Sequence, residues 1–497
     1  MLLQDNIYGN KLEENKAWYS GDIDIIADYY QSTSTKYNFY WAKQRIDLNR
    51  SVVHLPIAND IATTSSALLF SKPLKLYNDY TEKEIEYDKV LESVLLQNNF
   101  DSLLSEAGEV CSAFGGVFFK IDYDTRMAKH VIISKLLPSD VIAYFQRSWL
   151  YAVDICTEIK STETTFWRLI ERRQNIGTFL APRTRITYSL FEGTATSLGN
   201  QIDFSELPEM EGYQVADGEI NAPLGIVYVP NKKPNILLPN SEYGNSDYAI
   251  VYNLMDSLDE SWTSWMRDIR LGGGRLFIDE ALLDSTKNFD LLQEMYMKVP
   301  LADQQIAGEK YEPINKVQFE IRQEQHYNTC ESLCKEILMR AGYSPQTFGY
   351  DMKTYTESGS AQRIKEKKSI STTQTKQGYW KTGLNSLFLN IQAWEKELTK
   401  EVITNIPKMK FGDTLDVDIS VKSETLRNLS QAYAISTDQK VALLHPDWTF
   451  AEVKSESEKI LKEIQSGMKT NMSLAGEKIK GGNDDRPTGS DSRTDTE

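Results

Sequence analysis

The chain has little of what marks a secreted, membrane or metal-rich protein. It holds four cysteines and four histidines in 497 residues. So few cysteines argue against a disulfide scaffold and fit a reducing compartment. The N-terminus, Met-Leu-Leu-Gln-Asp-Asn, has neither a basic nor an apolar region, so we expect no signal peptide. No apolar run approaches the roughly 20 residues that a membrane helix needs. These absences predict a soluble protein made in the cytoplasm.

The chain also lacks an excess of positive charge. Its 71 acidic residues outnumber 55 basic ones, which gives a formal net charge of −16. Proteins that hold DNA tightly are usually basic, because neutralising phosphates drives their affinity. The composition therefore disfavours static DNA binding but leaves weak, sliding contact with DNA open. With 40 % hydrophobic residues, the chain has ample material for a large core.

No nucleotide-binding loop is present. The only run of three glycines is Gly272, Gly273 and Gly274, and Arg275 follows it. A phosphate-binding loop of the Walker type needs Lys-Ser/Thr after its glycines. We therefore interpret the three glycines as a flexible hinge.

Metal-binding and catalytic patterns are weak as well. His326, Cys330 and Cys334 follow one another at four-residue steps, but the outer pair would lie about 12 Å apart along a helix. We interpret the cysteines as buried apolar residues and His54 as a satisfied structural histidine. The carboxylates show no spacing typical of a two-metal nuclease. The sequence predicts no catalytic residue, no metal and no cofactor, and hence no enzyme.

The pattern of apolar residues predicts an α+β fold. The first hundred or so residues read as mainly helical, whereas 116–229 is rich in β-branched and aromatic residues with short polar gaps, typical of antiparallel hairpins. The Pro- and Asn-rich stretch 230–245 marks a boundary.

Two amphipathic helices flank an insertion of about 50 residues after that boundary. Ser246 and Asp247 predict the start of the first helix, as N-cap and first-turn acid. Gly342 predicts the end of the second, and Pro345 blocks its continuation. The apolar stripe of the first helix comprises Val251, Leu254, Leu258, Trp262, Trp265 and Ile269.

A Pro/Gly/Tyr-bearing loop and a long helix over 360–398 come next, with Gly378 and Gly383 as expected kink points. A strand is expected over 415–421 and further helices after it. The final residues, 471–497, are rich in Gly, Ser, Asp and Thr, which predicts disorder.

One basic run stands out in this acidic chain. It comprises Arg363, Lys365, Lys367 and Lys368, with Lys376 and Lys381 further on. Such a run is usually a solvated helix face. The alternative is a local patch that faces phosphates.

Several segments in order resemble the portal proteins of long-tailed bacteriophages, of the kind found in phages of Gram-positive bacteria. They are 54–62 (His-Leu-Pro-Ile-Ala-Asn-Asp-Ile-Ala) with 66–70 (Ser-Ala-Leu-Leu-Phe), the Ser246-Asp247 helix start, and 341–349 (Ala-Gly-Tyr-Ser-Pro-Gln-Thr-Phe-Gly) leading into 356–361 (Thr-Glu-Ser-Gly-Ser-Ala). The resemblance covers roughly residues 10 to 465.

The resemblance implies a portal-type ring subunit made of named parts. They are a wing (1–246), two stem helices (247–270 and 324–342), a small α/β clip (271–323), a tunnel loop with a long kinked helix (343–400), a helical crown (401–470) and a disordered tail (471–497). The residues that it places at DNA, in the tunnel loop and the basic run, are Tyr350, Met352, Lys353, Tyr355, Arg363, Lys365, Lys367 and Lys368.

The implied function is a ring, commonly of twelve copies, at one capsid vertex, through which double-stranded DNA enters during packaging and leaves during ejection. Implied partners are the terminase large subunit, the head-completion adaptor, and the major capsid and scaffolding proteins, with no membrane. The protein would reside in the virion, and in the host cytoplasm during assembly. Two alternatives stay open: a capsid scaffold or head–tail adaptor without a DNA conduit, and a metal-dependent DNA-processing enzyme.

Overall fold

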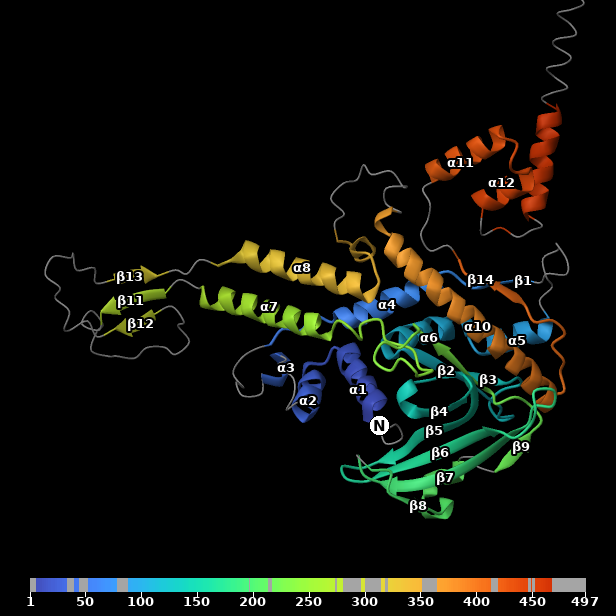
Figure 1. Cartoon of the computed structure of the whole chain (residues 1–497), viewed down its shortest axis with the longest axis horizontal. Helices are drawn as coiled ribbons and strands as arrows, with labels where there is room; N and C mark the ends of the chain where they lie inside the picture. The colour runs from blue at the N-terminus through green and yellow to red at the C-terminus, as the bar shows by residue number, and fades with distance from the viewer. Residues whose placement is uncertain are drawn as a thin grey trace, which may run out of the picture. The chain divides into compact units, whose positions relative to one another are not determined.

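The computed structural model describes residues 6–33, 40–43, 52–77, 88–195, 197–212, 217–272, 275–279, 296–299, 314–317, 321–350, 364–412, 419–445, 448 and 452–466. The chain divides into two compact units. The larger unit comprises Met1–Leu76 and Tyr87–Thr414, and the smaller comprises Tyr77–Glu86 and Leu415–Glu497. The larger unit combines helices with mainly antiparallel sheets, which confirms the α+β class (Figure 1).

The N-terminal part is mainly helical, as the sequence predicts. Asp88 caps α5 by accepting a hydrogen bond from the backbone N–H of Val90. Gly115 ends α6 in the left-handed conformation that favours glycine. The elements here are α1 (Asn6–Ser20), α2 (Ile23–Thr33), α3 (Tyr40–Lys43), α4 (Ile57–Phe70), β1 (Lys75–Tyr77), α5 (Lys89–Gln97) and α6 (Phe100–Phe114).

Antiparallel hairpins dominate residues 116–230, as predicted. A three-stranded sheet has the order β10-β2-β3, and a six-stranded sheet has the order β4-β5-β6-β7-β8 with β9 paired to β7. The strands are β2 (Gly116–Asp122), β3 (Ile132–Leu136), β4 (Val141–Gln146), β5 (Trp149–Ser161), β6 (Phe166–Asn175), β7 (Thr184–Gly193), β8 (Asn200–Ile202), β9 (Gly218–Ile220) and β10 (Ile226–Pro230), with short 3₁₀ turns at Pro138–Asp140, Phe204–Glu206 and Pro208–Gly212.

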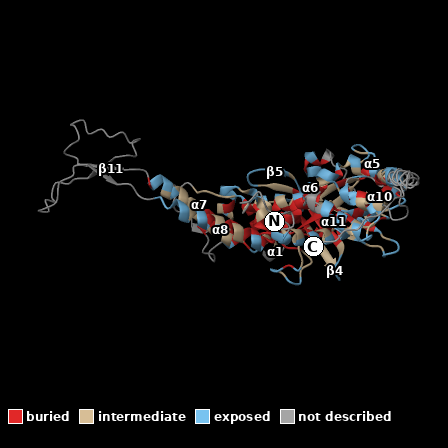
Figure 2. Ribbon diagram, turned by 90° about the horizontal axis from the view of Figure 1, so that it is seen from above, coloured by how far each residue is buried: buried red, intermediate tan, exposed pale blue. Residues whose placement is uncertain are grey.

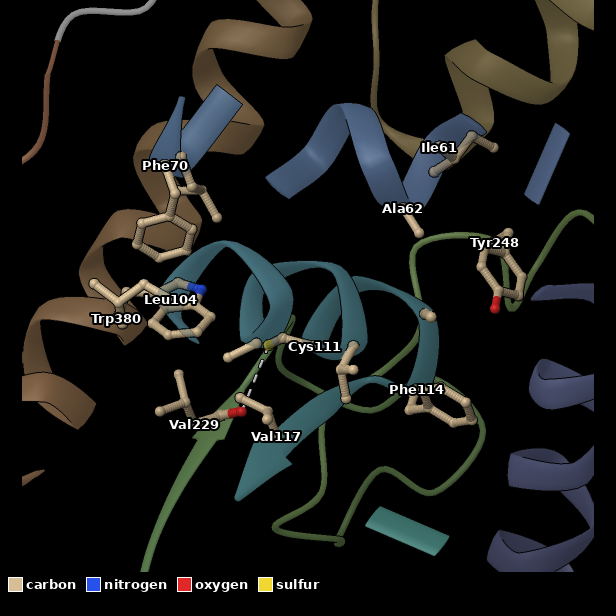
Figure 3. Packing of buried hydrophobic residues seen from close by; sticks show 14 of the residues in the cluster. Ile61, Ala62, Phe70, Leu104, Cys111, Phe114, Val117, Val229, Tyr248 and Trp380 are labelled. Carbon is tan, nitrogen blue, oxygen red and sulfur yellow. Dashed lines mark hydrogen bonds between the residues drawn. The ribbon is translucent and has the colours of Figure 1, made fainter. Parts of the chain in front are cut away.

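The main core forms where α10 (Lys367–Leu398) packs with α4, α6 and the three-stranded sheet. Trp380 of α10 contacts Phe70 edge-on, with ring centroids 4.8 Å apart. Figure 3 shows these rings beside Leu104 of α6, and the Cys111 thiol directed at the carbonyl of Val229. We call this part of the larger unit the body. A further two-stranded sheet pairs β1 with β14 (Lys408–Lys410).

Helices α7 (Tyr252–Leu271) and α8 (Gln323–Ala341) run side by side, and we call this pair the strut (Figure 1). Gly342 ends α8 with φ 107°, and the N–H of Tyr343 donates to the carbonyl of Leu338, as in a Schellman motif. The predicted C-terminus of this helix is therefore confirmed. Between α7 and α8, β11 (Arg275–Asp279) pairs with β12 (Tyr296–Val299) and β13 (Ile314–Val317). A short 3₁₀ helix (Pro345–Phe348) follows α8.

The predicted start of α7 is wrong. The helix begins at Tyr252, and Ser246 and Asp247 lie before it, both buried. The physical reason is that tertiary contacts take up the Asp247 carboxylate, so it does not serve the first turn of a helix.

The helices that the structure describes in the smaller unit are α11 (Ile419–Gln431), α12 (Thr437–Leu444) and a helix over 452–466. The strand expected over 415–421 is wrong at its end, because residues from Ile419 onward are helical. The predicted disorder of 471–497 falls outside the described residues. No helix that the structure describes combines the length and apolar character needed to cross a membrane.

Candidate functional site: the strut and its junction with α10

Among the described residues, the strut is buried against the body at one end, its base. The buried residues of α7 are Tyr252, Met255, Asp256, Leu258 and Asp259, all in its first two turns. Those of α8 are Cys330, Cys334, Ile337, Leu338 and Ala341, all toward its C-terminus. Figure 2 shows buried residues gathered in the body and giving way to intermediate and exposed ones along the strut.

A polar clamp joins the two helices at the far end. The Asp268 carboxylate of α7 accepts hydrogen bonds from Arg322 (2.7 Å) and from Nε2 of His326 (2.9 Å). Hydrogen bonds from His326 and then Arg322 hold the pKa of Asp268 below its usual range. The His326 ring also stacks parallel to Trp265. His326 is thus engaged with α7, and Cys330 and Cys334 are buried free thiols, which agrees with their structural interpretation.

Two carboxylates at the base of α7 hold the N-terminal segment. Asp259 accepts hydrogen bonds from the Trp41 indole (3.0 Å) and the Leu55 backbone (3.0 Å), and pairs with His54 Nδ1 at 2.7 Å. Asp256 accepts from the backbone N–H groups of residues 40 and 41. The contact with Asp259 supports a structural role for His54. The sequence carried no signal for the contact between His54 and Asp259, because the two residues are about 200 positions apart.

A buried ion pair lies where the strut meets α10. Lys376 Nζ contacts the Asp247 carboxylate, and their side chains are 4 % and 0 % exposed. Lys376 also donates to Ser65 (2.6 Å) and contacts Tyr343 Oη (2.9 Å). Asp247 accepts further hydrogen bonds from the Ser112 hydroxyl and from the Asn231 side chain (2.9 Å). Six different segments therefore converge on this pair: α4, α6, the residue after β10, the turn before α7, the residues after α8, and α10.

The ionised form of Asp247 is favoured at this junction. Burial by itself raises the pKa of Asp247. The charge of Lys376, and hydrogen bonds from Lys376, Ser112 and Asn231, outweigh that effect and hold the pKa below its usual range. The prediction that Lys376 extends the basic run is consequently wrong, because this ammonium is buried and neutralised.

The predicted DNA-facing residues have varied places. Lys365, Lys367 and Lys368 are exposed at the start of the α10 region, and Lys368 donates to the carbonyl of Met339. Tyr350 is partly buried against the core, and its pKa is raised by burial and next by a hydrogen bond with Cys334. The residues that lie outside the described part of the chain are Met352, Lys353, Tyr355 and Arg363.

Of the three hinge glycines, only Gly272 is described. A Cβ at this position would lie 2.7 Å from Ile321 Cγ1 and 2.9 Å from the Asp268 carbonyl. Close approach of the chain that enters α8 therefore gives Gly272 a steric role as well. Gly273 and Gly274 lie outside the described residues, so the hinge stays a prediction.

One group in the described part of the chain has the residue types of a metal site, namely His130, Glu395 and Glu401. Glu395 already accepts hydrogen bonds from His130 Nδ1 (2.6 Å), Val131 N (3.1 Å) and the Thr399 hydroxyl (3.0 Å). Lys129 pairs with Glu401 at 3.3 Å. These contacts attach the C-terminal end of α10 to the segment before β3, so the arrangement has a structural role.

The contacts above define a structural subunit: its buried charges hold helices together around a strut that is anchored at one end. The family model "Phage portal protein, SPP1 Gp6-like" matches residues 8–470. The chain therefore belongs to this portal family, whose members are structural components of the phage virion.

Comparison with other proteins adds little detail. No curated protein matches the chain. Two similar solved structures are chains of the neck of a GTA particle. In the empty particle computed with C6 symmetry, the identity is 13 %, the coverage is 78 % of this chain and 90 % of the other, and the TM-score is 0.42. In the native particle computed with C12 symmetry, the identity is 14 %, the coverage is 78 % of this chain and 89 % of the other, and the TM-score is 0.38.

Proposed function

We propose that this protein assembles into a closed ring at one capsid vertex and that the channel of the ring passes double-stranded DNA during packaging and ejection. The observation that carries the proposal is the strut. From residue 260 to the end of α7, and over the first seven residues of α8, no side chain is fully buried. The exposed apolar residues of this region are Ile269, Leu271, Ile321 and Tyr327.

Over the described residues of their outer halves, α7 and α8 bury little apolar surface, and most helical stability in proteins comes from tertiary packing of an apolar face. Lateral neighbours of the same kind would cover the strut, and copies related by rotation about one axis form a closed ring. Membership of the portal family supports further copies of this chain as the neighbours that cover the strut. We expect the ring to contain twelve copies.

The parts of the subunit follow from the same proposal. Helices α7 and α8 form the stem, and the sheet β11–β13 belongs to the clip, which docks the terminase and later the connector. The body forms the wing, and the smaller unit forms the crown. The tunnel loop lies between α8 and α10, where Lys353 and Lys365 guide the DNA backbone. The acidic remainder of the chain prevents DNA from being held in one place.

Strut variants test the ring. In the full-length protein, Ile269→Lys with Tyr327→Lys is expected to abolish rings in negative-stain images and native mass spectra while far-ultraviolet dichroism is unchanged. Met127→Lys, at an exposed turn before β3, is the matched control and is expected to assemble. Wild-type protein that stays monomeric under all assembly conditions would exclude a portal ring.

Two alternative functions make different predictions. A scaffold or adaptor without a conduit would form rings, but Lys365→Glu would leave DNA retention unchanged. A DNA-processing enzyme would cleave DNA in the presence of magnesium and lose that activity when one carboxylate is replaced.

A further inference from the structure

The two halves of α10 are held in place by different interactions. In the second half, apolar side chains are buried in the core of the body; they are Trp380, Leu384, Leu387, Phe388, Ile391 and Trp394. In the first half, the buried side chains are polar, namely Ser369, Thr373 and Lys376. Apolar packing has no directional partner, whereas each polar contact can be broken and re-formed at a defined distance.

The polar contacts of the first half reach the end of the strut. The Ser369 hydroxyl accepts a hydrogen bond from the Ser344 backbone (2.8 Å) and lies 2.8 Å from the Thr347 hydroxyl. The Thr372 hydroxyl donates to the carbonyl of Gly342 (2.6 Å). Gly342 immediately follows the last residue of α8. This row of contacts therefore connects the first half of α10 to the strut.

The Lys376–Asp247 ion pair is the last of these contacts along α10. It ties the helix to the turn that leads into α7, so α10 is attached to the roots of both strut helices. A buried pair of this kind contributes little net stability but resists separation, because either charge left alone is poorly solvated. Breaking the pair is costly, so it restrains the position of α10 relative to this turn, and we call it the latch.

Gly378 lies at the boundary between the two halves. A Cβ at Gly378 would meet nothing within 4 Å, so no close packing requires a glycine there. A Cβ at Gly383, one and a half turns later, would lie 2.5 Å from Val229 Cγ2, which explains that glycine sterically. Glycine inside a helix is unfavourable relative to alanine, because it adds backbone freedom that folding must remove.

We infer that Gly378 is a hinge about which the segment 367–377 swings relative to the fixed second half of α10, with the Lys376–Asp247 pair as its latch. A displacement of the base of α7 or α8 is transmitted through the latch and through Gly342, and the segment 367–377 then moves as one rigid lever. The strut and the start of α10 are thereby mechanically coupled.

Hydrogen–deuterium exchange on the assembled full-length protein tests the hinge. Amides of 370–377 are expected to exchange roughly tenfold faster than those of 384–395. Gly378→Ala is expected to slow exchange in 370–377 by roughly fivefold and to leave 384–395 unchanged. Asn385→Ala, at another exposed position in the second half, controls for helix propensity and should leave 370–377 unchanged. Equal exchange in both halves, or equal slowing of both by Gly378→Ala, would overturn the inference.

Hydrogen–deuterium exchange also tests the latch. Lys376→Met is expected to speed exchange in 367–377, whereas Lys381→Met, at an exposed lysine, should not. Identical exchange in these two variants would remove the latch from the inference. The further claim that this lever serves DNA passage rests on the proposed function, and a separate measurement tests it. Heads assembled with Gly378→Ala should contain less DNA than heads with Asn385→Ala, and equal DNA content would leave the hinge standing but exclude this use of it.

Discussion

Nδ1 of His54 lies 2.7 Å from Oδ2 of Asp259, and both side chains are almost fully buried. The contact connects residues 205 positions apart and attaches the segment before α4 to the base of the strut. Asp259→Ala would leave the Trp41 indole N–H and the Leu55 N–H without an acceptor. We expect a loss of about 3 kcal/mol in the free energy of unfolding, measured by urea denaturation followed by tryptophan fluorescence.

Asp268→Ala is the matched control on the same helix. Its carboxylate accepts hydrogen bonds at the far, more exposed end of the strut. Exposed pairs contribute at most about 1 kcal/mol. If both variants lowered stability equally, the distinction between the buried base and the more exposed far end of the strut would be wrong.

The pH dependence of stability should carry a signature of Asp256. Burial raises the pKa of Asp256 to about 6 in the folded protein, above its ordinary value of 3.8. The folded state therefore binds the proton more tightly than the unfolded state. This group stabilises the fold at low pH, and that contribution is lost as the pH rises through 6.

Asp256→Asn should remove that dependence. Between pH 7 and pH 4, the wild type should gain about 1–2 kcal/mol relative to the variant, after allowance for solvent screening. Denaturation midpoints at several pH values measure the difference. Parallel curves for the two proteins would mean that Asp256 is not the group responsible.

Gly225→Ala should destabilise the body. Gly225 has φ +67°, and an added Cβ would lie 2.4 Å from the Trp394 ring and 2.9 Å from Arg173 Nη1. It would push apart the cation–π contact between these two side chains, whose separation is 5.2 Å. We expect a cost of about 3 kcal/mol, from overpacking and backbone strain together.

Gly349→Ala separates these two causes. Gly349 also has a positive φ, +84°, but a Cβ there would meet nothing within 4 Å. Only the backbone strain of about 1 kcal/mol should remain. Thermal unfolding of both variants gives the comparison, and equal shifts in Tm would contradict the clash at Gly225.

The buried ion pair should show strong coupling between its partners. Lys376→Met alone leaves the Asp247 carboxylate buried without its cation, at a cost of about 3–5 kcal/mol. The double variant Lys376→Met/Asp247→Leu removes both charges and should be less destabilised than the sum of the two single variants. A double-mutant cycle by urea denaturation measures this, and additive costs would argue against the pair.

Lys365→Glu should leave rings intact but impair DNA packaging or retention, because it reverses a charge at the start of the α10 region. Lys353→Glu is expected to have the same effect on DNA packaging or retention. Lys381→Glu reverses an exposed charge on the second half of α10 and serves as the control. DNA content of purified heads is the measurement. Normal DNA-filled heads from both test variants would remove these lysines from the proposed path of DNA.

Local features of the fold were predictable from the sequence. The hairpins over 116–230 follow from β-branched residues and short polar gaps, and the end of α8 follows from Gly342, since only glycine readily adopts its φ. The apolar residues of α10 after Gly378 likewise indicated a buried helix.

The junction could not be predicted in this way. Asp247 and Lys376 are 129 residues apart, and each has a plausible local interpretation, as a first-turn acid and as part of a basic run. Tertiary burial overrides both, because an unpaired charge cannot remain in the core. The anchoring of His54 by Asp259 escaped prediction for the same reason: no local pattern encodes contacts across such sequence distances.

The two ends of the strut have a consequence for how such proteins diversify. The chain leaves α7 at Leu271 and re-enters α8 at Gln323, and the Asp268–Arg322 contact of 2.7 Å holds exit and entry together. A segment whose ends are held side by side can be exchanged without altering the rest of the fold. The length and sequence of this segment can therefore change without requiring compensating changes in the rest of the fold.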